Sequence, residues 1–492
     1  MSQEEKKIEI RVGNSMCTLV LDKTHMSFLI AKEALAILRN SLKFKVDNVK
    51  YATAGSAWDG TVYKITARGE FATGFLPFCC KILIANGFII KLTDLRENVV
   101  TFIKDPEYLK KLGDDVLADH QLSSVMSAIN YTVMGMPFPR GVLDIATNGG
   151  KTHISAKIIE LASANRVIFT VHKESLVAQT VENYLKIFPN DVSYVLSTTQ
   201  MPPKARIVVC MYKTLSNRVK TSERWMNWFL ASEMLIVDEC HRARGAELSS
   251  LIELSNAYCK YLMSGTPFDY PSKLQKAEMV GLSGSTLVKI ENKELIGKGW
   301  STPPVIYMYY NNKGFFANGY ADMTNKNLKF NEDRNNIILD VVKKNQDIQG
   351  IIVTNKIAHA RHLSKYLSDR LKWNVPWISG QHKDRWARIE QLKSGSLKCL
   401  IVTDILKEGD NIPTLDYIVL VAGGKDVIFV KQTIGRILRI RDGKVEGKIY
   451  DIYDDFKYLK DHSEARIKTY VENSFEIKPM SDEISVKLRK RK

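Results

Sequence analysis

Short apolar runs recur along the chain from about residue 113 onward, and helix-like segments separate them. Strands buried on both faces have this pattern, and their alternation with helices predicts parallel α/β sheets. The pattern occurs in two series, so we expect two consecutive α/β lobes. The first series comprises 141–146, 166–171, 205–211, 234–239 and 261–267, and the second comprises 349–354, 375–379, 399–404, 417–423 and 448–454.

The segments outside these two series differ in pattern. Residues 1–110 carry short alternating stretches and one amphipathic stretch, which predicts a small α+β domain before the lobes. We expect the first lobe at 111–300 and the second at 331–480. Between them, 301–330 contains the prolines, glycines and aromatic residues of a linker with an insertion. The chain ends in a basic tail, 481–492.

Composition and charge restrict the partners. The 492 residues include 71 Lys and Arg against 54 Asp and Glu, a formal net charge of +17. This charge attracts polyanions, such as nucleic acid or an anionic membrane. No run of about 18 apolar residues is present, so a membrane partner is not expected. The start of the chain lacks a secretory pattern, and the seven cysteines have no C-x-x-C spacing, so we expect reduced thiols, no zinc site and a cytoplasmic location.

One candidate nucleotide site follows the first apolar run of the first lobe. The stretch from Ile145 to Thr152 ends in Gly-Gly-Lys-Thr and precedes an amphipathic segment. A backbone loop at a helix N-terminus can hold phosphates, with Lys151 reaching the β and γ phosphates and the Thr152 hydroxyl holding Mg²⁺. The loop backbone would come from Thr147, Asn148, Gly149 and Gly150. The alternative is a plain turn before a helix, since Ile145 stands where the first glycine of the full motif would be.

A pair of carboxylates ends a later strand of the same lobe. Asp238 and Glu239 follow the apolar run Leu235–Val237. In this position Asp238 could hold Mg²⁺ and Glu239 could act as general base on the attacking water. Solvated acids at a strand end are the alternative for this motif alone. Together and in this order, the loop and the carboxylates predict an ATPase that uses ATP and Mg²⁺.

The sequence Asp238-Glu239-Cys240-His241 resembles the D-E-x-H box of superfamily 2 helicases. Further segments of that family occur in the expected order over about residues 117–440. The resemblance implies two tandem RecA-like lobes, with Gln121 reading adenine, His241 acting in the catalytic box, and Ser264, Gly265 and Thr266 coupling hydrolysis to lobe movement.

The same resemblance implies a nucleic-acid site and a second-lobe contribution to hydrolysis. Nucleic-acid contacts would come from His172, Lys173, Gln179, Tyr212, Lys213, Thr214 and Thr403, and further nucleotide contacts from Gly409 and Asp410. Gln432, Arg436 and Arg439 lie in a Q-x-x-G-R-x-x-R pattern, whose arginines would stabilise charge on the γ-phosphate. The sequence departs from the family at Asn148 and Gly149, and at His172 and Lys173, where many relatives have Pro-Thr.

The N-terminal part adds a narrower resemblance. Trp58-Asp59-Gly60, the segment 71–88 and the segment 238–252 are similar to the phage helicases of the UvsW type. This implies a DNA helicase of bacteriophage type that remodels branched DNA by junction branch migration, fork regression or dissolution of D-loops and R-loops in recombination, repair or replication. Separately, we expect a monomer that acts in the cytoplasm, which is the host cytoplasm if the protein is viral. Two alternatives stay open: an RNA helicase, and an ATP-gated nucleic-acid clamp that does not unwind.

The aromatic segment 309–320 has two interpretations. It could form a strand-separating wedge in which Phe315 or Phe316 stacks on a base. It could instead be an ordinary hinge loop with packed aromatic side chains.

Overall fold

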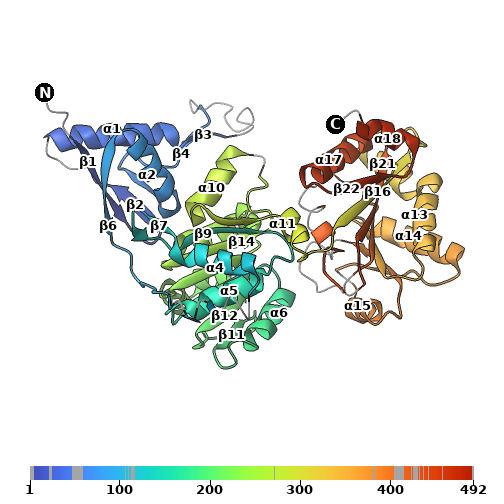
Figure 1. Ribbon diagram of the computed structural model, residues 1–492, viewed down its shortest axis with the longest axis horizontal. Helices are drawn as coiled ribbons and strands as arrows, with labels where there is room; N and C mark the ends of the chain where they lie inside the picture. Colours follow the sequence, from blue (N-terminus) through green and yellow to red (C-terminus); the bar gives the residue numbers. More distant parts are fainter. Residues whose placement is uncertain are drawn as a thin grey trace. The chain divides into compact units, whose positions relative to one another are not determined.

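The structure is a computed structural model of the chain (Figure 1). It describes residues 5–21, 25–46, 59–105, 107–108, 110–111, 117–270, 272–380, 382, 384–403, 415–422, 424, 430, 433–435, 437–441, 443–456 and 458–489. The chain divides into two compact units. The first comprises Met1–Ile145 and Gly149–Ile290, and the second comprises Ala146–Asn148 and Glu291–Lys492.

The N-terminal part of the first unit is an α+β layer. Its sheet has the described strand order β5-β2-β1-β6, and helices α1 and α2 pack on the same apolar face, because their side chains share one core with alternate residues of β1. The elements are β1 (Lys6–Val12), β2 (Met16–Leu19), α1 (His25–Ser41), β3 (Lys43–Lys45), β4 (Thr61–Tyr63), β5 (Glu70–Ala72), a 3₁₀ turn (Thr73–Phe75), α2 (Leu76–Ala85) and β6 (Phe88–Asp94).

The rest of the first unit is a parallel α/β lobe. Its described sheet has the order β11-β12-β10-β13-β14-β9-β15, and every pair in it is parallel. The strands are β9 (Arg140–Ile145), β10 (Val167–Val171), β11 (Val192–Val195), β12 (Ile207–Met211), β13 (Met234–Asp238), β14 (Cys259–Ser264) and β15 (Thr286–Ile290). The helices are α4 (Asp119–Asn130), α5 (Lys151–Leu161), α6 (Glu174–Leu185), α7 (Tyr212–Thr221), α8 (Glu223–Leu230), α9 (Ala246–Leu254) and α10 (Lys273–Ser283). A short hairpin joins β7 (Thr132–Val133) and β8 (Met136–Pro137), and a 3₁₀ turn spans Cys240–Arg244.

The second unit repeats this architecture. Its described sheet, also wholly parallel, has the order β18-β19-β17-β20-β21-β16-β22. The strands are β16 (Pro304–Asn311), β17 (Gly350–Thr354), β18 (Trp377–Ile378), β19 (Cys399–Thr403), β20 (Tyr417–Leu420), β21 (Gly447–Asp454) and β22 (Glu476–Pro479). The helices are α11 (Asn292–Gly297), α12 (Tyr320–Met323), a π-helix (Thr324–Lys329), α13 (Glu332–Lys344), α14 (Ile357–Leu371), α15 (Arg385–Lys393), α17 (Leu459–Glu472) and α18 (Asp482–Arg489).

Apolar side chains fill both faces of the central strands in each lobe. All five residues of β10 are buried, and so are all five of β17 and of β19. In the second unit, two separate apolar cores receive the alternate residues of β17, with Ile351 and Val353 in one and Ile352 in the other. The fold class predicted from the sequence, two tandem RecA-like parallel-sheet lobes preceded by an α+β region, is therefore confirmed.

Two segments that were expected outside the lobes contain regular structure of the second unit. Part of the predicted linker, Pro304–Asn311, is strand β16, which pairs with β21 and β22 inside the second sheet. The aromatic residues Tyr307, Tyr309 and Tyr310, which contributed to the linker prediction, are half-buried positions of this strand. The predicted basic tail is helix α18 as far as Arg489, because Ile484 is buried in the core and Lys487 pairs with Asp455 at 2.9 Å.

Histidine 359 makes the stability of the second unit depend on pH. The side chain is buried on α14, where Thr354 contacts its Nδ1 at 3.2 Å. Burial, followed by the charge of Arg334, lowers the pKa of His359 well below 6.5. The unfolded chain therefore binds a proton at a higher pH than the folded chain does. The contribution of neutral His359 to the free energy of unfolding is fully present above the unfolded pKa near 6.5. It is lost as the pH falls through the window down to the folded pKa, by about 1.4 kcal/mol per pH unit.

We expect the urea midpoint of the second unit to fall between pH 7.5 and pH 5, and the fall to be smaller in His359→Leu. The difference between the two chains isolates this group, since all other titrating groups are common to both. Equal pH dependence of the two chains would contradict the assignment. Tryptophan fluorescence reports the transition, because Trp373 and Trp377 pack on the core of this unit.

Candidate functional site

The predicted catalytic segments of the first lobe gather at one edge of its sheet. Strands β9, β14 and β13 are consecutive neighbours, and all run in the same direction. Their carboxyl ends therefore meet at one edge, where ligands bind in parallel α/β sheets. Asp238 ends β13, Ser264 ends β14, and the loop after β9 leads to Lys151 at the start of α5.

The loop after β9 has a backbone that few residues can adopt. Gly150, the N-cap of α5, has φ +82°, and Asn148 has φ +72°. A Cβ on Gly150 would stand 2.0 Å from the Gln121 side-chain nitrogen, so the position needs glycine for both its backbone and its space. The Lys151 ammonium donates to the Ile145 carbonyl at 3.3 Å, which folds it back over the loop.

Helix α4 supports the loop from outside. The Gln121 side chain accepts from the Ala118 N–H at 3.2 Å, and its amide lies against Gly150. The neighbouring His120 is buried, and its Nε2 lies 3.3 Å from the Gly149 carbonyl oxygen. Sequence reasoning missed His120. Its position directly before a predicted nucleotide residue was the available signal.

The two carboxylates differ in electrostatic environment. Burial, and then the neighbouring Glu239 carboxylate, raise the pKa of the Asp238 carboxyl, against the opposing charge of Lys151. Burial also acts to raise the pKa of Glu239, but the hydrogen bond with His241 and the charge of Lys151 outweigh it and lower that pKa. Glu239 is therefore ionised at neutral pH and able to accept a proton. Its backbone is left-handed, with φ +51°, which turns the chain sharply after β13.

A hydrogen-bonded group joins the carboxylates to the end of β14. The His241 Nδ1 lies 3.2 Å from a Glu239 carboxylate oxygen and 3.0 Å from the Ser264 hydroxyl. That hydroxyl also accepts from the Thr266 N–H at 3.1 Å. The Tyr270 hydroxyl donates to the His241 carbonyl at 3.1 Å and supports the turn. The predicted catalytic and coupling segments are thus in direct contact through one histidine.

The predicted nucleic-acid residues of the first lobe follow two other strands at the same edge. His172 and Lys173 come after β10, and Lys173 caps helix α6, which carries Gln179. Tyr212 starts α7 immediately after β12, and Lys213 and Thr214 lie in its first turn. His172 is buried at 9% exposure, whereas Lys213 is exposed.

The structure describes only part of the predicted site in the second unit. Thr403 ends β19, and its hydroxyl donates to the Ile378 carbonyl at 3.4 Å. Burial lowers the pKa of Arg439, whose carbonyl oxygen accepts from the Thr302 hydroxyl at 3.3 Å. Four predicted residues of this unit lie outside the described residues, namely Gly409, Asp410, Gln432 and Arg436. Trp58 of the N-terminal part also lies outside them.

The described residues hold neither a metal-ligand cluster nor a membrane span. No group of three or more His, Cys, Asp or Glu residues there could hold a metal ion, and no described helix is long and apolar enough to cross a membrane. All seven cysteines are buried free thiols.

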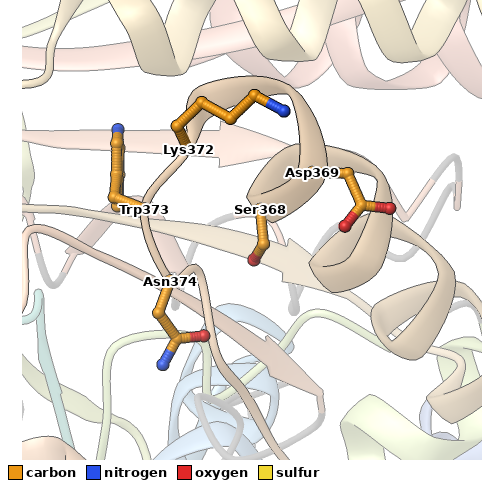
Figure 2. Close-up of a pocket in the computed structure, with 5 residues that line it drawn as sticks. All are labelled: Ser368, Asp369, Lys372, Trp373 and Asn374. Carbon is orange, nitrogen blue, oxygen red and sulfur yellow. The ribbon is translucent and has the colours of Figure 1, made fainter.

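A surface hollow of about 520 Å³ lies at the C-terminal end of α14, lined by Ser368, Asp369, Lys372, Trp373 and Asn374 (Figure 2). None of the predicted site residues lines it. It is therefore separate from the candidate site.

Two family models match the lobes. Residues 116–269 match the res subunit of type III restriction enzymes, and residues 333–441 match the helicase conserved C-terminal domain. The chain therefore belongs to the superfamily 2 helicases, whose domains imply ATP-dependent activity on nucleic acid.

Within this class the chain resembles UvsW. It is 25% identical to the "ATP-dependent DNA helicase uvsW" of Enterobacteria phage T4, over 69% of this chain and 74% of that protein. It is 23% identical to "Putative helicase 22" of Sulfolobus islandicus filamentous virus, over 91% of this chain and 82% of that protein. A solved structure of S. cerevisiae Dbp5 bound to RNA and ADP BeF3 matches the fold at a TM-score of 0.51 and 17% identity, covering 78% of this chain and 98% of that chain.

Proposed function

We propose that this protein is an ATP-dependent DNA helicase that remodels branched DNA in recombination, repair or replication, by migrating junctions, regressing forks or dissolving displacement loops and R-loops. The observation that carries the proposal is the similarity to a phage DNA helicase over about seven tenths of both chains. The net charge of +17 suits a polyanionic partner. We further propose that the protein acts as a monomer in the cytoplasm of its host, and that the N-terminal α+β domain contributes to DNA binding.

The first-lobe residues fit a nucleoside triphosphate. The left-handed Gly150 lets the Gln121 amide pack where a Cβ would stand, and the loop backbone from Thr147 to Gly150 leads into the N-terminus of α5, which favours phosphate. Lys151 would bind the phosphates, Thr152 and Asp238 would hold Mg²⁺, and Gln121 would contact the base. When bound, Mg²⁺ would neutralise charge that develops on the transferred phosphate.

The protein's own groups would then act in the following way. Glu239 accepts the proton of the attacking water, and His241 orients the Glu239 carboxylate through the 3.2 Å contact. Arg436 and Arg439, together with Gln432, contribute from the second lobe, so that hydrolysis requires closure of the lobes. Gly409 and Asp410 complete the nucleotide contacts.

Movement would be coupled to hydrolysis through the hydrogen bonds of Ser264. A change at Glu239 alters the bonds that His241 and the Thr266 N–H make with this hydroxyl. Together with Gly265, these residues carry the change to the strands that hold nucleic acid. The nucleic-acid contacts would be those of His172, Lys173, Gln179, Tyr212, Lys213, Thr214 and Thr403.

The test is the ATPase rate with Mg²⁺ in the presence of duplex DNA, single-stranded DNA, a four-way junction or RNA, with gels that follow strand exchange. We expect the junction to stimulate most, and Lys151→Ala to lose both hydrolysis and strand exchange. Lys157→Ala is the matched control, because Lys157 lies on the same helix and pairs with Glu160. Stimulation by RNA alone would replace the DNA assignment with an RNA helicase. ATP-dependent binding without strand exchange would identify a clamp.

A further inference from the structure

Two adjacent phenylalanines are exposed between β16 and α12. Phe315 is 58% exposed and Phe316 is 87% exposed. Single apolar side chains on a surface are common, but two neighbouring aromatic rings leave a large apolar area in water. We call Phe315 and Phe316 the aromatic platform.

The backbone of the aromatic platform is fixed from beneath by a buried asparagine. Asn327, which is 0% exposed, accepts from the Phe315 N–H at 2.6 Å and donates to the Phe315 carbonyl at 2.9 Å. Asn331 donates to the Lys313 carbonyl. A Cβ on Gly314 would stand 2.4 Å from the Phe456 ring, so the chain here packs closely against the lobe. The loop therefore holds a defined conformation while its two rings face solvent.

Lysine side chains lie beside the aromatic platform. Lys313 is 71% exposed and pairs with Asp333 at 3.1 Å, and Lys326 is 47% exposed and pairs with Asp322 at 2.9 Å. Such exposed ion pairs are weak, so a phosphate can replace the acids. The Lys326 ammonium donates to the Phe316 carbonyl at 3.3 Å, next to the exposed rings. Aromatic faces beside lysines are typical of surfaces that bind single-stranded nucleic acid, since the rings stack on bases and the ammonium groups approach phosphates.

We propose that the aromatic platform stacks on unpaired bases of a single strand that the motor has separated. This proposal rests on the proposed function for its context, and it adds a base-binding site on the second lobe. An apolar protein partner would also cover the rings, but the helicase domains on either side of this segment act on nucleic acid, which favours a base as the occupant. The two hydrogen bonds of the Asn327 side chain fix the backbone of Phe315, so little backbone conformational entropy is lost when a base stacks.

The test is the affinity of the full-length protein for a single-stranded DNA oligonucleotide that carries 2-aminopurine, whose fluorescence is quenched on stacking. We expect Phe316→Ala to weaken binding by about 5- to 100-fold and to reduce the quenching. Phe316→Tyr should retain both, because it keeps the ring. Phe316→Leu should lose both, because it keeps apolar bulk without an aromatic face. The matched control is Trp386→Ala on α15, another exposed aromatic of this unit at 42% exposure, which should behave as the parent protein does.

Two outcomes would overturn the proposal. Unchanged affinity and quenching in Phe316→Ala would show that no base stacks there. Parent-like DNA affinity and quenching in Phe316→Leu would show that the surface makes an apolar contact that does not require an aromatic ring. Neither outcome would contradict the proposed function. That function is tested separately, by the junction-stimulated ATPase rate of the parent protein and the loss of this rate in Lys151→Ala. An oligonucleotide of RNA in parallel shows whether the platform distinguishes the sugar.

Discussion

Replacing Glu239 with glutamine is expected to lower the kcat of ATP hydrolysis by about 10²- to 10⁴-fold, the usual contribution of a general base. Glutamine has nearly the same shape, and its amide oxygen can still accept from His241, which contacts Glu239 at 3.2 Å. It cannot take a proton from water. Nucleotide affinity should stay close to that of the parent protein, because the phosphates are assigned to Lys151 and the loop before it.

Single-turnover hydrolysis and the binding of a fluorescent ATP analogue would separate these two effects. Glu253→Gln is the matched control, since it makes the same chemical change at an exposed position at the end of α9. A kcat within a few-fold of the parent in Glu239→Gln would contradict the assignment of the base. A large loss of analogue binding would instead assign Glu239 to the nucleotide pocket.

Replacing Arg140 with alanine is expected to destabilise the first unit by about 3–5 kcal/mol. This arginine is 2% exposed, and it donates to the carbonyl oxygens of Asn14 at 2.6 Å, Leu282 at 3.0 Å and Ser283 at 3.1 Å. These carbonyls belong to the N-terminal layer and to the lobe, so one side chain joins the two. The alanine would leave the carbonyls without this donor, in a cavity. Urea unfolding, with hydrogen exchange of β1 and β2, would measure the loss.

Arg206→Ala is the matched control for this prediction. Arg206 also donates to carbonyl oxygens, those of Ile159 at 2.8 Å, Ala162 at 2.9 Å and Ala164 at 2.8 Å, but its side chain is 26% exposed. Water can replace its bonds, so we expect a loss below about 2 kcal/mol. Equal losses in the two variants would contradict the importance of burial at Arg140.

The junction around Arg140 was not predictable from the sequence. Lys260 is also buried there, and its ammonium donates to the Ser255 carbonyl at 2.7 Å and to the Ser15 hydroxyl at 3.3 Å. A Cβ on Gly74 would stand 2.1 Å from the Val280 carbonyl oxygen. The N-terminal layer and the first lobe therefore pack backbone against backbone at this point. Arginine and lysine usually predict a solvated surface. Arg140 is buried because it donates to carbonyl groups more than 100 residues away, and Lys260 also reaches the distant Ser15 hydroxyl, so no local pattern contains these partners.

The predicted strands illustrate what local pattern can determine. The run 166–171 became β10 at Val167–Val171, and 234–239 became β13 at Met234–Asp238, because a strand buried on both faces requires an unbroken apolar run. Strand β11 was not predicted, because it lies at the sheet edge and only Val195 of its four residues is buried.

The sequence by itself determined the class of the protein. The order of the motifs from Gln121 to Arg439 and the two series of apolar runs depend on residue type and spacing, and both can be read along the chain. Tertiary structure decided which groups meet: His120 with the Gly149 carbonyl, and His241 with Ser264. It also decided that Asn327 fixes the exposed Phe315 backbone. The physical reason is that hydrogen bonds and burial depend on distances in space, and the fold creates those distances between residues that are far apart in the chain.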